Sequence, residues 1–374
     1  MNTQIDFLFL SEEDMLEAGV TDMNRCIASM EDMFSLLGKG DYRMGSKNSN
    51  SHGIMVDFPD DPPFPNMPKN GPDRRYMAMP AYLGGRFDIV GNKWYGSNKE
   101  NCEIGLPRSI LTLMLNDKNT GAPVALMSAN ILSSMRTGAV PGVAAKYLAG
   151  KNPKVLGIIG PGVVNKSSAS AMLTACPTID TVKICGRRRE TSENMEQYLR
   201  ERYPQIQTVE ILETHEEAVR GADVITIATS GAAQDPYIKA EWIKPGAFFN
   251  LPASIHFDDS FLQEDRVRHV VDNWLMYESW KDEFGYPLYK AIDEMACYYE
   301  DMIHDNTLDP KRIIELGDII NGNTPARNHP DDIVLFTTGG MPVEDVAWGY
   351  DLYQTALEKN LGTKLTLWKE PHMI

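Results

Sequence analysis

The sequence lacks several features that would assign it to large classes of protein. No apolar run approaches the ~20 residues needed to span a bilayer. The first residues, Met1–Asp6, place no basic stretch ahead of an apolar core, so neither a membrane span nor a signal peptide is expected. Positive charge is also scarce, with a formal net charge of −16. This balance argues against nucleic acid or an anionic membrane as a partner, because both require clustered cations.

Cysteine is equally sparse. The five cysteines are odd in number and share no short spacing; they are Cys26, Cys102, Cys176, Cys185 and Cys297. This distribution predicts neither a disulfide framework nor a metal site, and a reduced, cytoplasmic protein is expected. The rest of the composition is ordinary for a globular protein, with 43% apolar and 24% charged residues. A length of 374 residues predicts two domains.

The most informative stretch is Lys154–Asn165, an apolar run followed by a glycine turn and then by small residues. This order predicts a buried strand, a tight turn and a helix, as a dinucleotide-binding fingerprint requires. Gly160 would allow the turn, and Gly162 would let a pyrophosphate approach the backbone at the start of the helix. The third glycine of the pattern is replaced by Asn165. An ordinary strand-to-helix turn is the alternative.

Strand and helix patterns alternate after this turn. Further strands are expected at Thr181–Cys185, Thr208–Leu212, Val224–Thr229, Ala247–Leu251 and Val267–Val271. The alternation predicts an α/β fold with a Rossmann-type, doubly wound parallel sheet. Before it, residues 9–38 are expected to be helical, and antiparallel strands are expected between residues 76 and 128. A last helix, from Val343 to Lys359, would return to the first domain.

The second strand of the expected parallel sheet ends in a basic turn. An NAD-binding protein would normally place Asp or Glu there to accept the ribose 2′-OH. This chain has Arg187, Arg188 and Arg189 instead. Guanidinium groups suit a 2′-phosphate by charge and by bidentate geometry. The sequence therefore favours NADP(H), with NAD(H) or a merely solvated basic turn as alternatives.

Short motifs outside the glycine turn occur in a fixed order along the chain. They are Met79–Tyr82, Gly91–Asn98, Ser133–Ala139, Ala144–Ala149, Ala222–Ile225, Lys244–Gly246 with Asn250, Leu316–Asp318 and Asp332–Phe336. In this order they resemble the ornithine cyclodeaminase/μ-crystallin family. The resemblance implies an α+β substrate and dimerisation domain made of residues 1–130 and 328–374, a Rossmann domain at 131–327, and a homodimer. It also implies hydride transfer between a nicotinamide cofactor and the carbon of a small-molecule amine, amino acid or imine.

The resemblance places the family's lysine at Lys93 and its arginine at Arg136. Lys93 would move the proton at the substrate nitrogen, since partial burial lowers a lysine pKa; a surface lysine is the alternative. Arg136 would hold a substrate carboxylate or the pyrophosphate, with an ion pair between domains as the alternative. His256, in the loop expected to face the nicotinamide, is a further candidate proton donor. The residues expected to contact the cofactor are Thr137, Gly160, Gly162, Val163, Val164, Arg187, Arg188, Ala228, Thr229 and Leu251.

Departures from the family pattern bear on the reaction. The loop Leu251–His256 has no acid where the cyclodeaminase branch carries an aspartate, so conversion of ornithine to proline is not expected. The family's carboxylate-binding arginine is matched best by Lys47. Glu344 and Asp345 are interpreted as an acidic first helical turn. The expected function is NAD(P)-dependent oxidation or reduction at a C–N bond. The alternative is a non-catalytic NADP(H)-binding protein or an accessory subunit of an amine-oxidising system.

Overall fold

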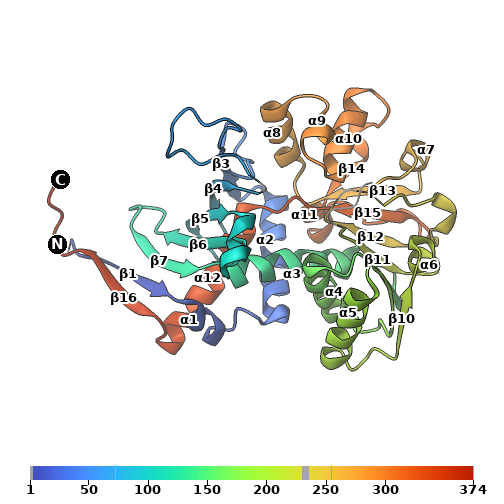
Figure 1. Cartoon of the computed structure of the whole chain (residues 1–374), viewed down its shortest axis with the longest axis horizontal. Coiled ribbons are helices and arrows are strands. Elements are labelled where there is room, and N and C mark those ends of the chain that lie inside the picture. The colour runs from blue at the N-terminus through green and yellow to red at the C-terminus, as the bar shows by residue number, and fades with distance from the viewer. Residues whose placement is uncertain (1–2, 72, 230–235, 254, 374) are drawn as a thin grey trace. The chain divides into compact units, whose positions relative to one another are not determined.

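The computed structural model describes residues 3–71, 73–229, 236–253 and 255–373. The chain divides into two compact units, each built from separate stretches of sequence. The first unit comprises Met1–Asp22, Gly40–Arg136 and Gly340–Ile374, and the second comprises Met23–Lys39 and Thr137–Gly339. Figure 1 labels the helices and strands of both.

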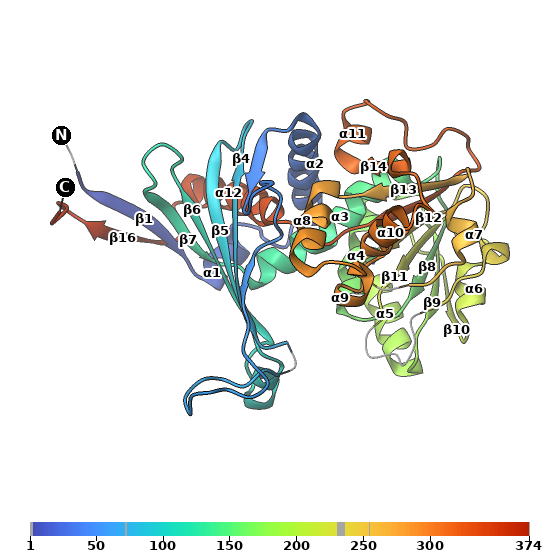
Figure 2. The ribbon, with the colours of Figure 1, turned by 90° about the horizontal axis from the view of Figure 1, so that it is seen from above.

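The first unit is built on an eight-stranded sheet whose main order is β16-β1-β7-β6-β5-β4-β2, with β3 also paired to β4. Its strands are β1 (Ile5–Leu10), β2 (Tyr42–Met44), β3 (Ile54–Val56), β4 (Arg75–Leu83), β5 (Ile89–Ser97), β6 (Ser109–Asn116), β7 (Pro123–Ser128) and β16 (Thr363–Trp368). The expected antiparallel strands between 76 and 128 are confirmed as β4 to β7. Figure 2 shows residues 57–71 and the 3-10 helix η1 (Lys99–Ile104) extending beyond the ends of β4, β5 and β6.

Helix α12 (Pro342–Lys359) packs against β4, β5 and β6 on one face of this sheet. Glycines permit the close approach: a Cβ at Gly91 would lie 2.7 Å from Val346, and one at Gly349 would lie 2.2 Å from Leu113. Side chains alternate along β5, so Lys93 lies on the same covered face as Gly91. The short helix α1 (Glu12–Glu17) completes this unit.

The second unit contains eight parallel strands in the order β10-β9-β8-β11-β12-β15-β13-β14. They are β8 (Val155–Ile159), β9 (Thr181–Cys185), β10 (Thr208–Leu212), β11 (Val224–Ile227), β12 (Phe248–Leu251), β13 (Val267–Val271), β14 (Ile313–Glu315) and β15 (Ile333–Thr337). The accompanying helices are α2 (Met23–Lys39), α3 (Asn130–Leu148, which begins in the first unit), α4 (Val163–Ala175), α5 (Arg189–Arg202), α6 (His215–Val219), α7 (Asp259–Leu262), α8 (Trp274–Phe284), α9 (Leu288–Ala291), α10 (Met295–His304), α11 (Leu316–Ile320), η2 (Ala240–Trp242) and η3 (Pro310–Arg312). The predicted Rossmann-type parallel sheet is confirmed.

The N-terminal region differs from the expectation. Residues 9–38 do not form one helix: the range holds the end of β1, then α1, a turn and most of α2. Helix α2 also belongs to the second unit rather than to a domain covering 1–130. The reason is its buried side, which packs against α4 and α11. A Cβ at Gly38 would lie 2.6 Å from Gly317 of α11, so the two helices meet backbone to backbone.

The expected return to the first domain at 328 is also displaced. Strand β15 lies between β12 and β13, in the middle of the parallel sheet. All five of its residues are buried, as a central parallel strand requires. After β15 the chain therefore returns to the first unit at Gly340, shortly before α12.

Candidate active site

Four buried charged side chains meet where β5, α3 and α12 pack together. We call Lys93, Arg136, Glu344 and Asp345 the ion quartet. Lys93 Nζ donates to Asp345 Oδ2 at 2.7 Å and to the Ser133 hydroxyl at 3.3 Å. Arg136 donates through Nε to Asp345 Oδ1 at 3.2 Å and through Nη1 to Glu344. Lys93 is 2% exposed, Arg136 is 5% exposed, and both carboxylates are fully buried.

The start of α12 positions both carboxylates. Pro342 occupies the first helical turn, where its missing N–H costs nothing. Glu344 Oε1 accepts the backbone N–H of Met341 at 3.0 Å, which fixes the entry to the helix. Glu344 and Asp345 do complement the helix dipole, but an acidic first turn is an incomplete interpretation, because both are also partners of buried cations. Sequence reasoning missed this pairing.

The pKa of Lys93 is shifted toward neutrality. Burial lowers this pKa to about 8 and the charge of Arg136 adds to the effect, while Asp345 and Glu344 oppose it. Burial alone would raise the pKa of Asp345, but Arg136 and Lys93 outweigh it and the pKa lies below its usual value. Lys93 can therefore gain or lose a proton near physiological pH, as an acid–base group must.

A histidine that sequence reasoning did not select lies beside the quartet. His52 Nδ1 is 2.8 Å from the Gly340 carbonyl, so this nitrogen carries the proton, since a carbonyl only accepts. Burial lowers the pKa of His52 to about 4, with the charges of Lys93, Arg136 and Arg75 adding to the effect. The imidazole is therefore neutral at physiological pH. Its position in a polar loop, without helical or strand periodicity, gave no signal in the sequence.

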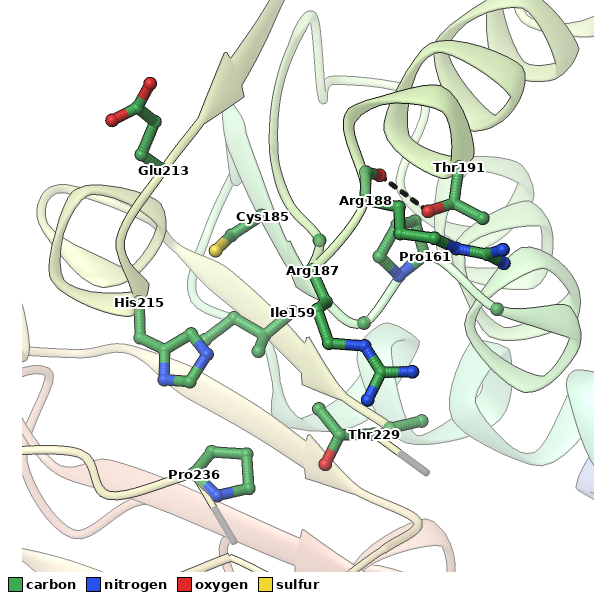
Figure 3. Close-up of a pocket in the computed structure, with 14 residues that line it drawn as sticks. Ile159, Pro161, Cys185, Arg187, Arg188, Thr191, Glu213, His215, Thr229 and Pro236 are labelled. Atoms are coloured by element: carbon green, nitrogen blue, oxygen red, sulfur yellow. Dashed lines mark hydrogen bonds between the residues drawn. The ribbon is translucent and has the colours of Figure 1, made fainter. Parts of the chain in front are cut away.

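The second unit holds a cavity of about 440 Å³ at the carboxyl ends of its first strands (Figure 3). Ile159 and Gly160 from β8 and its turn, and Cys185 from β9, line it. Gly160 has φ +81°, and a Cβ there would lie 2.2 Å from the Ala228 carbonyl oxygen, so only glycine fits. A Cβ at Gly162 would meet no atom within 4 Å, which leaves that backbone open to a ligand.

Six of the ten predicted cofactor residues line this cavity. They are Gly160, Gly162, Arg187, Arg188, Ala228 and Thr229. The other four do not: Val163 and Val164 open α4, Leu251 ends β12 and Thr137 lies in α3. His256 does not line it either. Its exposed ring packs edge-on against Tyr289, with ring centres 5.9 Å apart.

Asn165, the residue that replaces the third glycine, stabilises the glycine turn after β8 through hydrogen bonds. Its amide donates to the carbonyls of Ile159 at 2.7 Å and Gly160 at 2.9 Å. Its side-chain oxygen accepts from the Thr226 hydroxyl at 2.7 Å. The incomplete glycine pattern is therefore compensated by a buried side chain that holds β8, the turn and β11 together.

The arginine turn offers polar groups to an anion. Arg187 and Arg188 line the cavity, and Arg187 also lines a neighbouring hollow of about 250 Å³ with Ser192. The Ser192 hydroxyl is buried and has no hydrogen-bond partner among the residues that the structure describes. Glu213 is an acid on the wall of both spaces, but its carboxylate points away from Arg187 in Figure 3. The residues present fit a phosphorylated nucleotide.

The described ranges contain neither a cluster of metal-ligating side chains nor a helix suited to span a membrane. No three His, Cys, Asp or Glu side chains gather there as a metal site would require. No helix in these ranges combines the length and apolar character needed to cross a bilayer.

Comparison with known proteins places these features in a family. Residues 19–360 match the model of the ornithine cyclodeaminase/mu-crystallin family. The chain is 32% identical to N-((2S)-2-amino-2-carboxyethyl)-L-glutamate dehydrogenase of Staphylococcus aureus, over 79% of this chain and 82% of that protein. It is 28% identical to alanine dehydrogenase of Archaeoglobus fulgidus, over 98% and 100% of the two chains. Its fold is similar to that of Thermococcus litoralis Δ1-pyrroline-2-carboxylate reductase in complex with NADH and L-proline, with a TM-score of 0.74, 25% identity and coverage of 96% and 99%. The chain belongs to the ornithine cyclodeaminase/mu-crystallin family.

Proposed function

We propose that this protein is an NADP(H)-dependent oxidoreductase that acts on the C–N bond of a small amino acid, amine or imine. The observation that carries the proposal is the buried Lys93, whose pKa of about 8 is set by burial and by Arg136. The similar proteins named above are dehydrogenases and a reductase of nitrogen-bearing substrates. When bound, the cofactor supplies or accepts the hydride.

The role of the protein's own residues follows from the quartet. Reduction of an imine requires a proton at nitrogen, and oxidation of an amine requires its removal. Lys93 serves both directions because it changes charge near neutral pH. Asp345 and Ser133 hold its Nζ atom in place, and Arg136 and Glu344 balance the buried charge. No acid in the loop Leu251–His256 replaces the cyclodeaminase aspartate, so we expect no proline from ornithine.

The preference for NADP(H) over NAD(H) is a separate part of the proposal. Arg187 and Arg188 stand where an NAD-binding protein presents an acid. The buried Ser192 hydroxyl nearby makes no hydrogen bond with the described residues. Fluorescence titration should therefore show tighter binding of NADPH than of NADH. Changing Arg187 and Arg188 together to Ala should weaken NADPH by about 10-fold or more, the size of lost charge-assisted bonds, and leave NADH unchanged. Arg200→Ala, on the outer side of α5, is the control. Equal binding of both cofactors to the wild type would refute the preference.

The alternative is a protein that binds NADP(H) without chemistry, or an accessory subunit of an amine-oxidising system. The absent loop acid favours it, and the intact quartet favours the enzyme. Following NADPH absorbance against a panel of cyclic imines, and of 2-oxo acids with amines, separates the two. Catalytic consumption with one class of substrate supports the enzyme. Tight NADPH binding with no consumption across the panel supports the alternative.

We also propose that the protein is a homodimer that pairs through the first unit. The sheet face opposite Lys93 is apolar although α12 leaves it uncovered: Tyr76, Trp94, Ile110 and Met114 are between 39% and 50% exposed. Tyr76 and Trp94 stack there with ring centres 6.3 Å apart. Exposed apolar faces of this kind are typical of protein interfaces. A similar solved structure is described as an alanine dehydrogenase dimer.

A further inference from the structure

A second polar cluster lies on the same face of the sheet as Lys93. Side chains two residues apart on a strand share a face, so Tyr95 and Ser97 follow Lys93 along β5. Arg75 of β4 and Ser109 of β6 are both paired with Ser97. A set of polar side chains from three neighbouring strands therefore extends from Lys93 toward one end of the sheet.

The ring of Tyr95 lies beside both Lys93 and Arg75. Lys93 Nζ is 5.9 Å from the centre of the ring, and the Arg75 guanidinium carbon is 5.4 Å from the same centre. The Tyr95 hydroxyl is 3.0 Å from Ser109 Oγ. Arg75 is paired with Ser97, which lies four residues beyond Lys93 on β5, so its backbone lies on the order of 13 Å farther along the strands than that of the acid–base lysine.

The charges of the two clusters differ. The ion quartet contains two cations and two carboxylates, so its formal charges cancel. Farther along the face, Asp73 forms ion pairs with two arginines. Arg108 Nε lies 2.6 Å from Asp73 Oδ2, and Arg75 Nε lies 3.4 Å from Asp73 Oδ1. We call Asp73, Arg75, Tyr95 and Arg108 the arginine cluster. Two guanidinium groups facing one carboxylate leave a net positive charge.

Two further observations indicate that the arginine cluster favours an anion. Arg75 Nε is buried, and its 3.4 Å ion pair with Asp73 does not have hydrogen-bond geometry, so the atom makes no hydrogen bond with the residues described in the structure. Burial alone would raise the pKa of Tyr95, but hydrogen bonding with Ser109 and Arg75 outweighs it and lowers this pKa below its usual value. The surroundings of the phenol therefore stabilise negative charge.

We propose that the arginine cluster binds an anionic group of the substrate that is remote from the reacting C–N bond, with Arg75 as the residue that determines this specificity. The substrate class is then an acidic amino or imino acid, with a second carboxylate several bonds from the nitrogen-bearing carbon. The inference rests on the proposed function, since it assumes that the reacting carbon lies at Lys93. Lys47, the sequence match to the family's carboxylate-binding residue, is exposed in the turn after β2 and is not needed for this contact.

The test uses two inert acids of the same chain length, glutarate and pentanoate, titrated calorimetrically into the NADPH-loaded protein. Glutarate should bind at least about 10-fold more tightly, as a charge-assisted bidentate contact implies. Arg75→Gln should remove the difference. Arg74→Gln should retain it, because that neighbouring arginine pairs with Glu100 instead. Equal binding of the two acids, or a preference that survives Arg75→Gln, would overturn the inference.

Turnover separates this inference from the proposed function. NADPH oxidation with 2-oxoglutarate and with 2-oxopentanoate, each with the same amines, should favour 2-oxoglutarate through a lower KM. No turnover with either acid, together with a glutarate preference that depends on Arg75, would refute the enzyme and keep the anion site. Turnover without that preference would refute the anion site alone. Arg75→Lys, which keeps the charge and loses the bidentate geometry, should be intermediate, and it replaces Arg75→Gln if that variant does not fold.

Discussion

At the scale of single residues, Lys93 is the position on which the chemistry depends. Lys93→Met keeps a side chain of similar length but removes the proton donor. We expect kcat to fall by about 10²-fold or more, the usual contribution of a general acid or base. NADPH affinity should not change, since the lining of the nucleotide cavity belongs wholly to the second unit. Lys118→Met, an exposed lysine paired with Asp88, is the control. An undiminished kcat would remove Lys93 from the mechanism.

The pH profile should follow the pKa of Lys93, which burial and Arg136 lower to about 8. Imine reduction needs Lys93 in its protonated form, so the rate of reduction should fall as the pH rises through about 8. Amine oxidation needs the neutral form, so its rate should rise over the same pH range. Glu344 raises the pKa of Lys93. Glu344→Gln should therefore move both profiles to lower pH by about 1 unit. Steady-state rates measured from about pH 6 to about pH 10, a range that brackets the transition, test this shift. A profile that does not move would show that another group titrates.

How far the site could be predicted also depends on the residue. Lys93 and Arg136 are recognisable from short motifs around them. Glu344 and Asp345 are not, because two acids in a first helical turn look alike in sequence whether they face water or a buried cation. His256 was selected for its loop, and the contact of its ring with Tyr289 has no local signal in the sequence. Burial and pairing arise from tertiary packing, which a local pattern does not contain.

At the scale of elements, the glycine turn depends on Asn165. Replacing Asn165 with Gly would restore the third glycine of the fingerprint but leave the Thr226 hydroxyl and two backbone carbonyls without this partner. We expect a loss of about 1–3 kcal/mol in the free energy of unfolding, because three side-chain hydrogen bonds of the buried Asn165 are lost, and weaker NADPH binding. Urea unfolding measures the first. Ser167→Ala, at a half-buried position on the same helix whose hydroxyl donates to carbonyls of that helix, should cost much less. A variant as stable as the wild type would show that the network is dispensable.

The elements themselves were predictable where the pattern is local. The hairpins from β4 to β7 and the strands β8 to β13 follow from apolar alternation or short apolar runs between turn residues. Strands β1 and β16 pair with each other from opposite ends of the sequence, and no local signal marks such a pairing. The position of β15 within the parallel sheet likewise depends on neighbours, β12 and β13, that are distant in sequence.

At the scale of the whole molecule, the sequence indicates two domains but not the course of the chain between them. Helix α2 precedes most of the first unit yet packs in the second, through contacts with α11 nearly 300 residues later. Contacts of that separation depend on which residues leave room for a close approach of distant segments, as at Gly38 and Gly317. Composition and length cannot supply them.

The proposed homodimer is tested at the same scale. Trp94→Glu places a charge on the apolar sheet face without disturbing the face that carries Lys93. We expect the variant to be monomeric by light scattering, since a buried unpaired charge costs several kcal/mol. Leu357→Glu changes an apolar residue of similar exposure on α12 and should remain dimeric. A Trp94→Glu dimer would place the interface elsewhere.

The most direct test of the proposed chemistry follows the hydride itself. NADPH deuterated at C4 on the transferring face, incubated with the protein and a cyclic or acyclic imino acid, should yield an amine with one deuterium on the carbon that bears nitrogen. Lys93→Met should bind the same cofactor and form little labelled product. Mass spectrometry of the product decides the matter. A wild-type protein that binds NADPH but transfers no deuterium to any imine would contradict the proposed oxidoreductase.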